Sequence, residues 1–520
     1  MADAARERAI STWFQEHPRR GPARPVHLGN EVAAYIDYDR YYSAAAAAVE
    51  AAGSGAVVFV AGHELVVDTP VTVAGREDRF GDVLARAGAR GAEVRLLLSG
   101  HLGNVNGPAV AWFKGRPGCV ALLDDRLRLP GTFHQKAVVT LGSDRAVAFV
   151  GGMDIATSRL ARPQLGEGPW HDVQVKVIGG AAYDVFDTFF TRWNSHLDGR
   201  RQPIAARLRQ RDDRRPLRAV QVVRTYGNPT TGTTLLALDP RRQRSDFADV
   251  MDQVRHPPFA FAPQGESGIH DALVQAIRAT RETIYVEEQY LVASAPIGGR
   301  SELLDALAET VARPTFKHLL ILTCGVGTVQ RELYQTNSHR RALWQKIAAA
   351  HPDRVSAWTY KDGQDRCYWV HSKAWLFDDT HAIIGSANFN RRGLTHDGEL
   401  AVAVMDAEPG GTWVRDLRVA LWLKHLPTHT RPVRADDVRD FETGRKLWVE
   451  NDDTLLRRLD LVAGDPAQPD GLVVCDGKPP DGRWGRLKRT IVCDLGPSIG
   501  GKSTRTPEGQ WDLAIDPDGT

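Results

Sequence analysis

Along residues 41–125, hydrophobic positions change repeatedly between a helical spacing and short continuous runs. Residues 41–53 and 78–91 show the helical spacing, whereas residues 56–65 and 92–100 are apolar runs rich in valine and leucine. Apolar residues three to four positions apart favour helices, and short β-branched runs favour buried strands. This alternation predicts an α/β fold with a mixed sheet flanked by helices.

The same order of patterns occurs a second time in the chain. Helix, strand, helix and strand patterns follow one another at residues 268–282, 283–292, 301–312 and 318–325. Each half then passes through one more strand to a histidine two positions before a lysine, and ends in an acidic strand and a tryptophan-containing helix. We therefore expect two similar α-β-α sandwich lobes, related by a pseudo-twofold axis, with an active site between them.

The repeat divides the chain into four predicted parts. These are a first lobe, a connector with an insert, a second lobe and an accessory C-terminal extension, at residues 1–205, 206–265, 266–430 and 431–520. The connector contains a charge run and a stretch of turn-forming residues without helical period, which is typical of a solvated join.

The repeated histidine and lysine lie at the heads of two apolar strands, as His134 and Lys136 in the first half and His371 and Lys373 in the second. Side chains alternate between the two faces of a strand, so each pair points to one side. A fixed ammonium group repels a metal cation and attracts an anion. Two such faces that meet between the lobes predict a site for an anionic substrate without a metal.

These motifs resemble those of the phospholipase D superfamily, whose signature HxKxxxxD, followed by a Gly/Ser-rich turn, occurs once in each half. The resemblance covers residues 41–426, and the second copy matches at His371, Lys373, Asp378, Gly385, Ser386 and Asn388. The first copy has Leu141 in place of the aspartate, but Asp144 lies seven residues before Gly151 and matches if three residues are inserted. Asp144 and Asp378 are thus expected to be motif residues with a structural role.

The resemblance implies a phosphodiesterase that needs no metal or cofactor. One neutral imidazole attacks phosphorus and forms a phosphohistidine, while the other protonates the leaving oxygen. By this resemblance His134 is the nucleophile and His371 the acid and base. Lys136 and Lys373 hold the non-bridging oxygens, assisted by four phosphate-binding positions, Ser386, Asn388, Gly152 and Asp154.

Each histidine also needs a group that holds its other ring nitrogen. The next strand in each half offers an acid, Asp172 in the first and Glu399 in the second, and the resembled family has an acid at these places. We expect each acid to serve the histidine of its own half, so that Asp172 keeps His134 in the attacking tautomer.

Composition narrows the function further. The net charge is only +2, which disfavours a non-specific nucleic-acid groove. The five cysteines lack metal-ligand spacing and indicate reduced thiols. No leader or apolar run of about 18 residues is visible. These features predict a cytoplasmic monomer that has a phospholipid substrate, contacts membrane surfaces transiently and has no stable nucleic-acid partner.

The expected reaction is hydrolysis of glycerophospholipids to phosphatidic acid, or transfer of the phosphatidyl group to another alcohol. The alternatives are a nuclease or other non-lipid phosphodiesterase of the same superfamily, and a cardiolipin-synthase-like transferase. Residues 496–503, GPSIGGKS, match a phosphate-loop pattern. A proline follows soon after instead of a clear helix, so we interpret this match as a Gly-rich turn.

Overall fold

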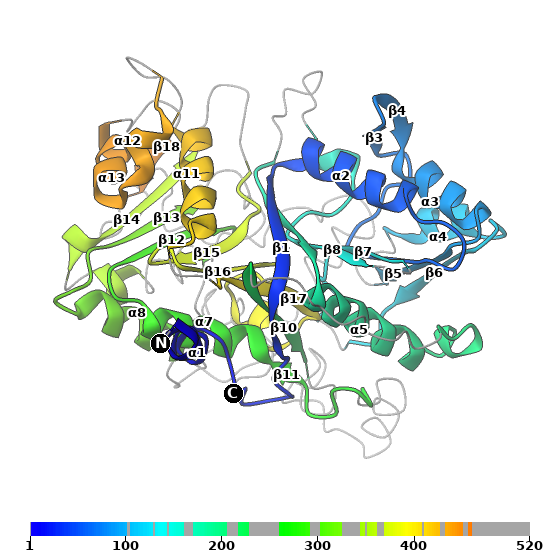
Figure 1. The fold of residues 1–520 in the computed structure, drawn as a ribbon, viewed down its shortest axis with the longest axis horizontal. Coiled ribbons are helices and arrows are strands. Elements are labelled where there is room, and N and C mark those ends of the chain that lie inside the picture. Colours follow the sequence, from blue (N-terminus) through cyan, green and yellow to red (C-terminus); the bar gives the residue numbers. More distant parts are fainter. Residues whose placement is uncertain are drawn as a thin grey trace, which may run out of the picture.

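The computed structural model (Figure 1) describes most of the chain up to residue 459. The described residues are 2–100, 105–127, 131–142, 145–160, 170–204, 217–227, 259–291, 302–324, 344–348, 351–360, 369–407, 410–426, 432–450 and 456–459. They form one 16-stranded sheet with helices on both faces, and a separate two-stranded hairpin. The predicted α/β fold with a mixed, helix-flanked sheet is confirmed.

The first lobe contributes one half of the sheet. From the middle of the molecule outward its strands follow the order β1-β9-β8-β7-β2-β5-β6. Their bounds are β1 (Val26–Ile36), β2 (Val57–Gly62), β5 (Glu93–Ser99), β6 (Cys119–Asp124), β7 (Ala137–Leu141), β8 (Ala146–Gly151) and β9 (Val173–Ile178). The separate hairpin consists of β3 (Pro70–Val73) and β4 (Arg76–Arg79).

The second lobe repeats this order on the other side. Its strands run outward as β10-β17-β16-β15-β12-β13-β14-β18, and β11 pairs with β10. Their bounds are β10 (Arg218–Tyr226), β11 (Glu266–Ser267), β12 (Thr283–Glu288), β13 (His318–Thr323), β14 (Val355–Tyr360), β15 (Lys373–Phe377), β16 (His381–Gly385), β17 (Glu399–Asp406) and β18 (Leu456–Leu459). In both lobes the inner strands are antiparallel and the outer triplet, β2-β5-β6 or β12-β13-β14, is parallel.

Strands β1 and β10 join the two lobes in the middle of the sheet. The first residues of β1 pair with β10, and the pairing continues with β9 after a register shift between Gly29 and Asn30. A strand that changes partner at an irregularity bends and twists. The two lobes are therefore parts of one hydrogen-bonded sheet.

Helices cover both faces of the sheet in each lobe. Their bounds are α1 (Ala2–Trp13), α2 (Tyr38–Glu50), α3 (Phe80–Ala89), α4 (Gly107–Phe113), α5 (Gly180–Ser195), α7 (Gly268–Ala279), α8 (Glu302–Ala312), α10 (Arg391–Thr395), α11 (Trp413–His425), α12 (Ala435–Arg439) and α13 (Phe441–Glu450), with 3-10 turns at Thr157–Arg159, Gly199–Arg201 and Pro352–Arg354. One hydrophobic core includes α5 and α11 and extends across both lobes, and Figure 1 shows these helices on opposite sides of the central strands. Separate cores lie under α2 and α3 and under α7 and α8.

The alternation of side chains along β2 explains why the sequence of this strand is a continuous apolar run. Val57 and Phe59 point into the core with α5, whereas Val58 and Val60 point into the core with α2 and α3. Strands covered on both faces are apolar at every position. The helices and strands predicted between residues 41 and 125 and their counterparts after residue 268 are confirmed.

Three predicted boundaries need correction. Helix α1 packs on α7 of the second lobe, with Trp13 and Phe14 in its core, although it precedes the first lobe in sequence. The predicted connector contains β10, a central strand of the sheet. The predicted accessory extension contains α12 and α13, which pack on α11, and β18, which pairs with β14. In each case an apolar face is buried against a neighbour that is distant in sequence.

Two other features bear on the sequence-based expectations. Cys119 and Cys324, the cysteines within the described residues, are buried and not disulfide-bonded. Within the same part of the chain, every helix is too short or too polar to cross a bilayer.

Candidate active site

The two histidine motifs meet where the lobes touch. Phe133, just before His134, forms a parallel bridge with Gly398, and His171 forms one with Val370, just before His371. The backbone N–H of His134 donates to the carbonyl of Gly398 at 2.8 Å, and that of His371 donates to the carbonyl of His171 at 2.8 Å. Each histidine segment is thus hydrogen-bonded to the segment of the opposite lobe that carries the acid.

The acids consequently serve the histidines of the opposite lobe. Nδ1 of His134 lies 3.0 Å from Oε1 of Glu399, and Nδ1 of His371 lies 2.7 Å from Oδ2 of Asp172. The prediction that each acid serves its own half is wrong. Within one lobe a full strand, β8 or β16, separates the two elements, and strands lie about 4.8 Å apart. The bridges between the lobes remove that separation.

Two of the predicted phosphate-binding positions support the acids instead. Ser386 donates its hydroxyl to Oε2 of Glu399 and is fully buried. At the equivalent position of the first lobe, a Cβ on Gly152 would lie 2.3 Å from Oδ1 of Asp172. Glycine there leaves room for the carboxylate, whose Oδ2 also accepts a hydrogen bond from Tyr38 at 3.1 Å. These contacts replace the predicted phosphate contacts of Ser386 and Gly152.

Both lysines are buried and held against the backbone of their own motif. Nζ of Lys136 donates to the carbonyl of His134 at 2.9 Å, and Nζ of Lys373 donates to the carbonyl of His371. Lys373 also donates to Oε1 of Gln289 at 3.1 Å. The two ammonium groups therefore flank the histidines, and their role in binding an anion stays a prediction.

The remaining two predicted phosphate positions differ from each other. Oδ2 of Asp154 lies 3.3 Å from Nζ of Lys136, so this carboxylate neutralises the lysine, and a carboxylate has no proton to donate to phosphate. The predicted phosphate contact of Asp154 does not fit this arrangement. Asn388 is buried, and its Oδ1 has no partner among the described residues. Of the four predicted phosphate positions, Asn388 therefore keeps an amide available for a ligand.

Burial shifts the ionisation of the whole site. It lowers the pKa of His134 and of His371 well below the ordinary value, and the positive charge of Lys373 acts in the same direction on both. Burial raises the pKa of Asp172 and of Glu399 to about 7, against the opposing charges of the lysines. It lowers the pKa of Lys373 to about 8. Burial thus favours the neutral imidazole that nucleophilic attack by His134 requires, whereas His371 must take up its proton against this preference, beside the carboxylate of Asp172.

Several side chains near the histidines were missed by the sequence analysis. The ring of His63, just after β2, lies 5.1 Å from that of His134. Trp170 stacks on Trp369 at 4.9 Å and lies 5.1 Å from His371, and the guanidinium of Arg159 lies 3.9 Å from the Trp170 ring. The only available signal was the position of His63 at a strand end equivalent to that of Gln289.

The two motif aspartates have different outcomes. The carboxylate of Asp378 accepts the backbone N–H groups of Arg281, Glu282 and Thr283 at 2.7 to 2.9 Å, where β12 begins. This is a structural role, as predicted. Asp144 and the phosphate-loop match at residues 496–503 lie outside the described residues.

A buried group of possible ligand atoms lies next to Asp172. The ligand atoms of His171, Glu287 and His425 are within 4.8 Å of one another. Glu287 accepts from Nε2 of His171 at 2.8 Å and from Nε2 of His425 at 2.9 Å, and His171 is also 3.0 Å from Asp37. Lys424 lies beside this histidine, and its charge opposes a cation. We assign the group as a hydrogen-bond network between the lobes.

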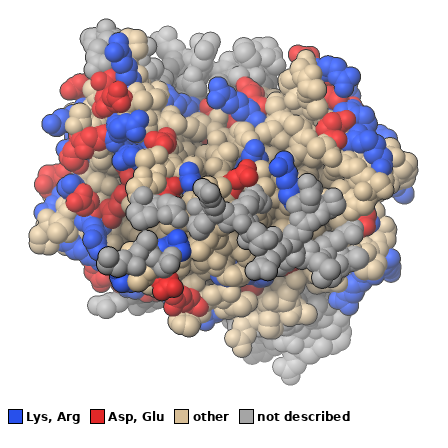
Figure 2. All heavy atoms as spheres, viewed as in Figure 1, with Lys and Arg blue, Asp and Glu red and all other residues tan. Residues whose placement is uncertain are grey.

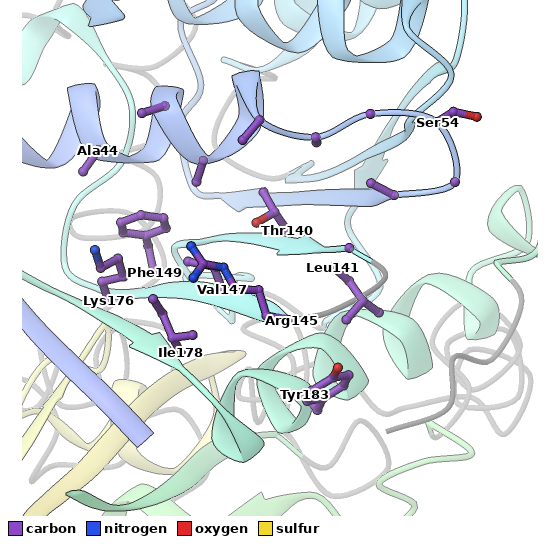
Figure 3. Close-up of a pocket in the computed structure, with 18 residues that line it drawn as sticks. Ala44, Ser54, Thr140, Leu141, Arg145, Val147, Phe149, Lys176, Ile178 and Tyr183 are labelled. Atoms are coloured by element: carbon purple, nitrogen blue, oxygen red, sulfur yellow. The ribbon is translucent and has the colours of Figure 1, made fainter. Parts of the chain in front are cut away.

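On the face of the molecule drawn in Figure 2, the described charged residues form no patch of a single sign. In Figure 2 positive and negative side chains are interspersed. An open groove of about 900 Å³ lies between α2 and strands β7 to β9 and is lined by alanines and by Thr140, Phe149, Arg145 and Lys176. Figure 3 shows these lining residues. Its described lining includes none of the histidines or acids discussed above, so we separate it from the active site.

Comparison with known families now identifies the class of protein. A phospholipase D family model matches residues 164–301, and a model described as "Cardiolipin synthase, PLD-like domain" matches residues 273–416. Together with the doubled motif and the fold, these matches define the class. The chain belongs to the phospholipase D superfamily.

Individual relatives are more distant. The chain is 24% identical over 489 residues to phospholipase D alpha 4 of Arabidopsis thaliana. This alignment covers 71% of this chain and 61% of the relative. The chain is also 24% identical over 435 residues to phospholipase D beta 1 of the same plant, covering 61% and 40% respectively. The crystal structure of a phosphatidylserine synthase from Haemophilus influenzae Rd KW20 has the same fold, with a TM-score of 0.53 at 12% identity over 86% of this chain and 97% of that one. The chain thus spans about 40 to 61% of the length of these plant relatives.

Proposed function

We propose that this superfamily phosphodiesterase cleaves glycerophospholipids at the distal phosphodiester bond, releasing phosphatidic acid and the head-group alcohol. The observation that carries the proposal is the pair of imidazoles in one site, each held at Nδ1 by a carboxylate of the other lobe. Within the described residues, the hydrogen bonds of both imidazole rings are made at Nδ1, which leaves Nε2 for the chemistry. The plant relatives are phospholipases D by name, which supports a lipid substrate.

The proposed reaction has two steps. Nε2 of His134 attacks phosphorus and forms a P–N bond, while His371 donates its proton to the leaving alkoxide as the P–O bond breaks. His371, now neutral, removes a proton from water, whose oxygen attacks phosphorus and displaces His134. Lys136, Lys373 and Asn388 hold the non-bridging oxygens and stabilise their charge in the transition states.

The same intermediate also accepts an alcohol in place of water. The second family model, described as cardiolipin synthase, favours such a transfer as the second candidate reaction. A nucleic-acid substrate is less well supported, because the net charge is +2 and charges of both signs are mixed on the surface in Figure 2. We propose a monomer that contacts membrane surfaces transiently.

A product assay tests the proposal. Purified protein is incubated with mixed phospholipid vesicles, with and without a primary alcohol, and in parallel with single-stranded DNA. We expect phosphatidic acid without the alcohol and a phosphatidyl alcohol with it. Because lysines and imidazoles supply every charge in the mechanism, both products should form in EDTA. Cleavage of DNA without cleavage of lipid would overturn the proposed substrate.

One shared active site makes a further prediction. Each of the variants His134→Asn and His371→Asn should lose nearly all activity, because acid-base help alone contributes about 10²- to 10⁴-fold and loss of the nucleophile costs more. Initial rates on vesicles measure the loss. Two independent sites would instead leave each variant roughly half active.

A further inference from the structure

Each active-site lysine lies opposite the last residue of a neighbouring strand. Glu288, at the end of β12, is the cross-strand partner of Lys373. In the first lobe Ala61 pairs with Ala137, and the next position in this register places Gly62 opposite Lys136. Directly opposite residues project to the same side, with Cβ atoms about 5 Å apart. One lysine therefore faces a glutamate, and the other faces a glycine.

In the first lobe the carboxylate comes from a different element. Asp154, in the turn after β8, lies 3.3 Å from Nζ of Lys136. Its Oδ1 accepts the backbone N–H groups of His63 at 2.8 Å and Glu64 at 3.1 Å, just beyond the end of β2. A Cβ added to Gly62 would lie 3.5 Å from this oxygen. This is ordinary van der Waals contact, and the carbonyl oxygen of Glu64 would lie nearer, at 3.2 Å. The carboxylate of Asp154 thus borders the space into which a side chain at position 62 would project.

The second lobe has the reverse arrangement. The position equivalent to Asp154 is Asn388, three residues after Gly385. The carboxylate of Glu288 accepts the backbone N–H of Phe389 at 3.1 Å, in the turn after β16, and the indole N–H of Trp375 at 3.2 Å. The same turn and the same strand end are therefore joined by a carboxylate in both lobes, but it starts from the turn in one and from the strand in the other.

We propose that Asp154 and Glu288 are positioning residues with the same role in the two lobes. Each joins the turn beside the lysine to the neighbouring strand end, Asp154 from the turn and Glu288 from the strand. Asp154 pairs directly with Lys136, Glu288 lies opposite Lys373 as its cross-strand neighbour, and each fastens the turn beside it, so that the lysine stays at the phosphate. The inference rests on the proposed function for its catalytic consequence. Its structural part, one carboxylate at each junction of strand end and turn, stands on the contacts above.

The junction between the strand end and the turn beside each lysine requires one carboxylate, neither none nor two. A buried ammonium group without a partner is strongly destabilising. Two carboxylates in the same buried space cannot both ionise, and one takes up a proton. The pairs Gly62 with Asp154 and Glu288 with Asn388 each supply one. Moving the first carboxylate to the strand should therefore be tolerated, whereas removing or duplicating it should not.

The exchange is tested with three variants of the full chain, Asp154→Asn, Gly62→Glu and the double variant. We expect each single variant to lose about tenfold to a hundredfold in kcat, as misplaced catalytic groups do. The double variant, which copies the second lobe, should return to within about threefold of the wild type. A double variant no better than Asp154→Asn, or an Asp154→Asn variant as active as the wild type, would overturn the inference.

Asp124→Asn is the matched control. Asp124 is also a fully buried carboxylate of the first lobe, at the end of β6, and it binds Arg126 and Arg192. Its variant should lose stability, but Gly62→Glu should not rescue it, because no lysine is involved. Rescue of Asp124→Asn by Gly62→Glu would mean general stabilisation and would count against the inference.

The second lobe offers an independent test. Lys373 faces the carboxylates of Glu288, Asp172 and Glu399 and the positive charge of Lys136. Burial raises the pKa of Glu288 to about 8, against the charge of Lys373, so its carboxyl is ionised on the alkaline side of the profile. The variant Glu288→Gln removes this negative charge, so the alkaline limb of the pH profile of kcat should move to lower pH. A merely structural role for Glu288 would lower kcat at every pH and leave the limb in place.

Failure of the proposed function is distinguishable from failure of this inference. If the wild type acts on no phosphodiester supplied, the function is wrong, and thermal unfolding of the same variants decides the inference. Gly62→Glu should then destabilise the wild type and stabilise Asp154→Asn. The same sign of effect in both backgrounds would overturn the inference.

Discussion

The neighbours of His134 determine which of its ring nitrogens carries the proton. Nδ1 of His134 lies 3.1 Å from the carbonyl of Ser386 as well as 3.0 Å from Glu399, and a carbonyl only accepts. The proton must therefore lie on Nδ1, which leaves the lone pair on Nε2 for attack. Glu399, and not Asp172, holds His134 in this tautomer.

The order of roles is tested by trapping. A His371→Ala variant given a substrate with an activated leaving group needs no general acid for the first step, but it lacks the base for the second. We expect the phosphatidyl group to accumulate on His134, with a P–N bond that is labile in acid and stable in base. Intact-mass measurement and peptide mapping locate it. An adduct on His371 in the reciprocal His134→Ala variant, with none on His134 here, would reverse the assignment.

The shifted ionisations predict a narrow pH optimum. Below about 7 Glu399 takes up a proton, because burial raises its pKa to about 7, and the attacking histidine loses its support. Above about 8 Lys373 loses its charge, because burial lowers its pKa to about 8. We expect kcat to be highest between these values. Lys373→Arg, which stays charged, should lose the alkaline limb even if its maximum is lower. A profile of the wild type that is flat across both values would contradict this account.

The identity of the site residues was more predictable than their partners. The repeated spacing indicates His134, Lys136, His371 and Lys373, because strand alternation places each pair on one face. The crossing of Asp172 and Glu399 was not predictable, because it depends on bridges between segments that are distant in sequence. Sequence periodicity describes one element at a time and contains no information on such bridges.

At the scale of elements, α1 depends on an unusual histidine. His381 on β16 is fully buried, and neither ring nitrogen has a partner among the described residues. Its ring stacks on Trp13 at 5.3 Å and meets the edge of Phe14 at 5.1 Å, at the end of α1. Burial alone lowers the pKa of His381 to about 3. Helix α1 is therefore packed on an imidazole that must remain neutral.

Acid should release α1 through this contact. The folded pKa of His381 lies below the unfolded value, so its contribution to stability is complete above about 6.5 and is lost as the pH falls toward about 3. Each pH unit in this window costs up to about 1.4 kcal/mol for this group. His381→Leu should move the loss of α1 to lower pH, measured by Trp13 fluorescence and hydrogen exchange. An unchanged acid midpoint in the variant would argue against it.

Elements with a strong hydrophobic periodicity were predicted correctly. Elements whose presence or position depends on contacts with distant parts of the chain were not. The apolar runs of β2 and β12 were recognised because both faces of each strand are covered. Helix α1 was assigned to the first lobe because sequence order was the only guide, whereas Trp13 and Phe14 bury their rings in the second. The central strand β10 was missed within a segment whose charge run dominated the pattern.

At the scale of the whole molecule, a buried network holds the lobes together behind the active site. Glu287 of the second lobe binds His171 of the first and His425 of the second, and Tyr285 donates to it at 2.7 Å. The interaction with His171 lowers the pKa of Glu287 well below its ordinary value, although burial opposes it. Because His171 immediately precedes Asp172, this network also holds in place the carboxylate of Asp172, which is hydrogen-bonded to His371.

Loss of this network should lower the free energy of unfolding of the whole molecule. Glu287→Gln leaves His171 without its buried partner, and breaking such pairs costs about 3–5 kcal/mol. The folded pKa of Glu287 is depressed, so its contribution is present above about 4.5 and is lost as the pH falls further. Chemical denaturation should therefore show a difference between wild type and variant at neutral pH that shrinks in acid.

An exposed acid provides the comparison for this prediction. Glu302→Gln removes an acid at the surface that pairs with Arg278 and Arg19, and exposed pairs contribute about 0–1 kcal/mol. This variant should unfold almost like the wild type at every pH. Equal losses in the two variants would show that Glu287 is no more than another ion pair.

The crossed acids also govern how the two copies of the repeat diverge over generations. A substitution of Glu399 damages the histidine of the other copy, and so does a substitution of Asp172, so selection acts on both copies together at these positions. Positions whose contacts stay within one lobe have more freedom. The contacts of Asp154 and of Glu288 with their turns and strand ends lie within one lobe, so a change there can be compensated in the same copy without a matching change in the other.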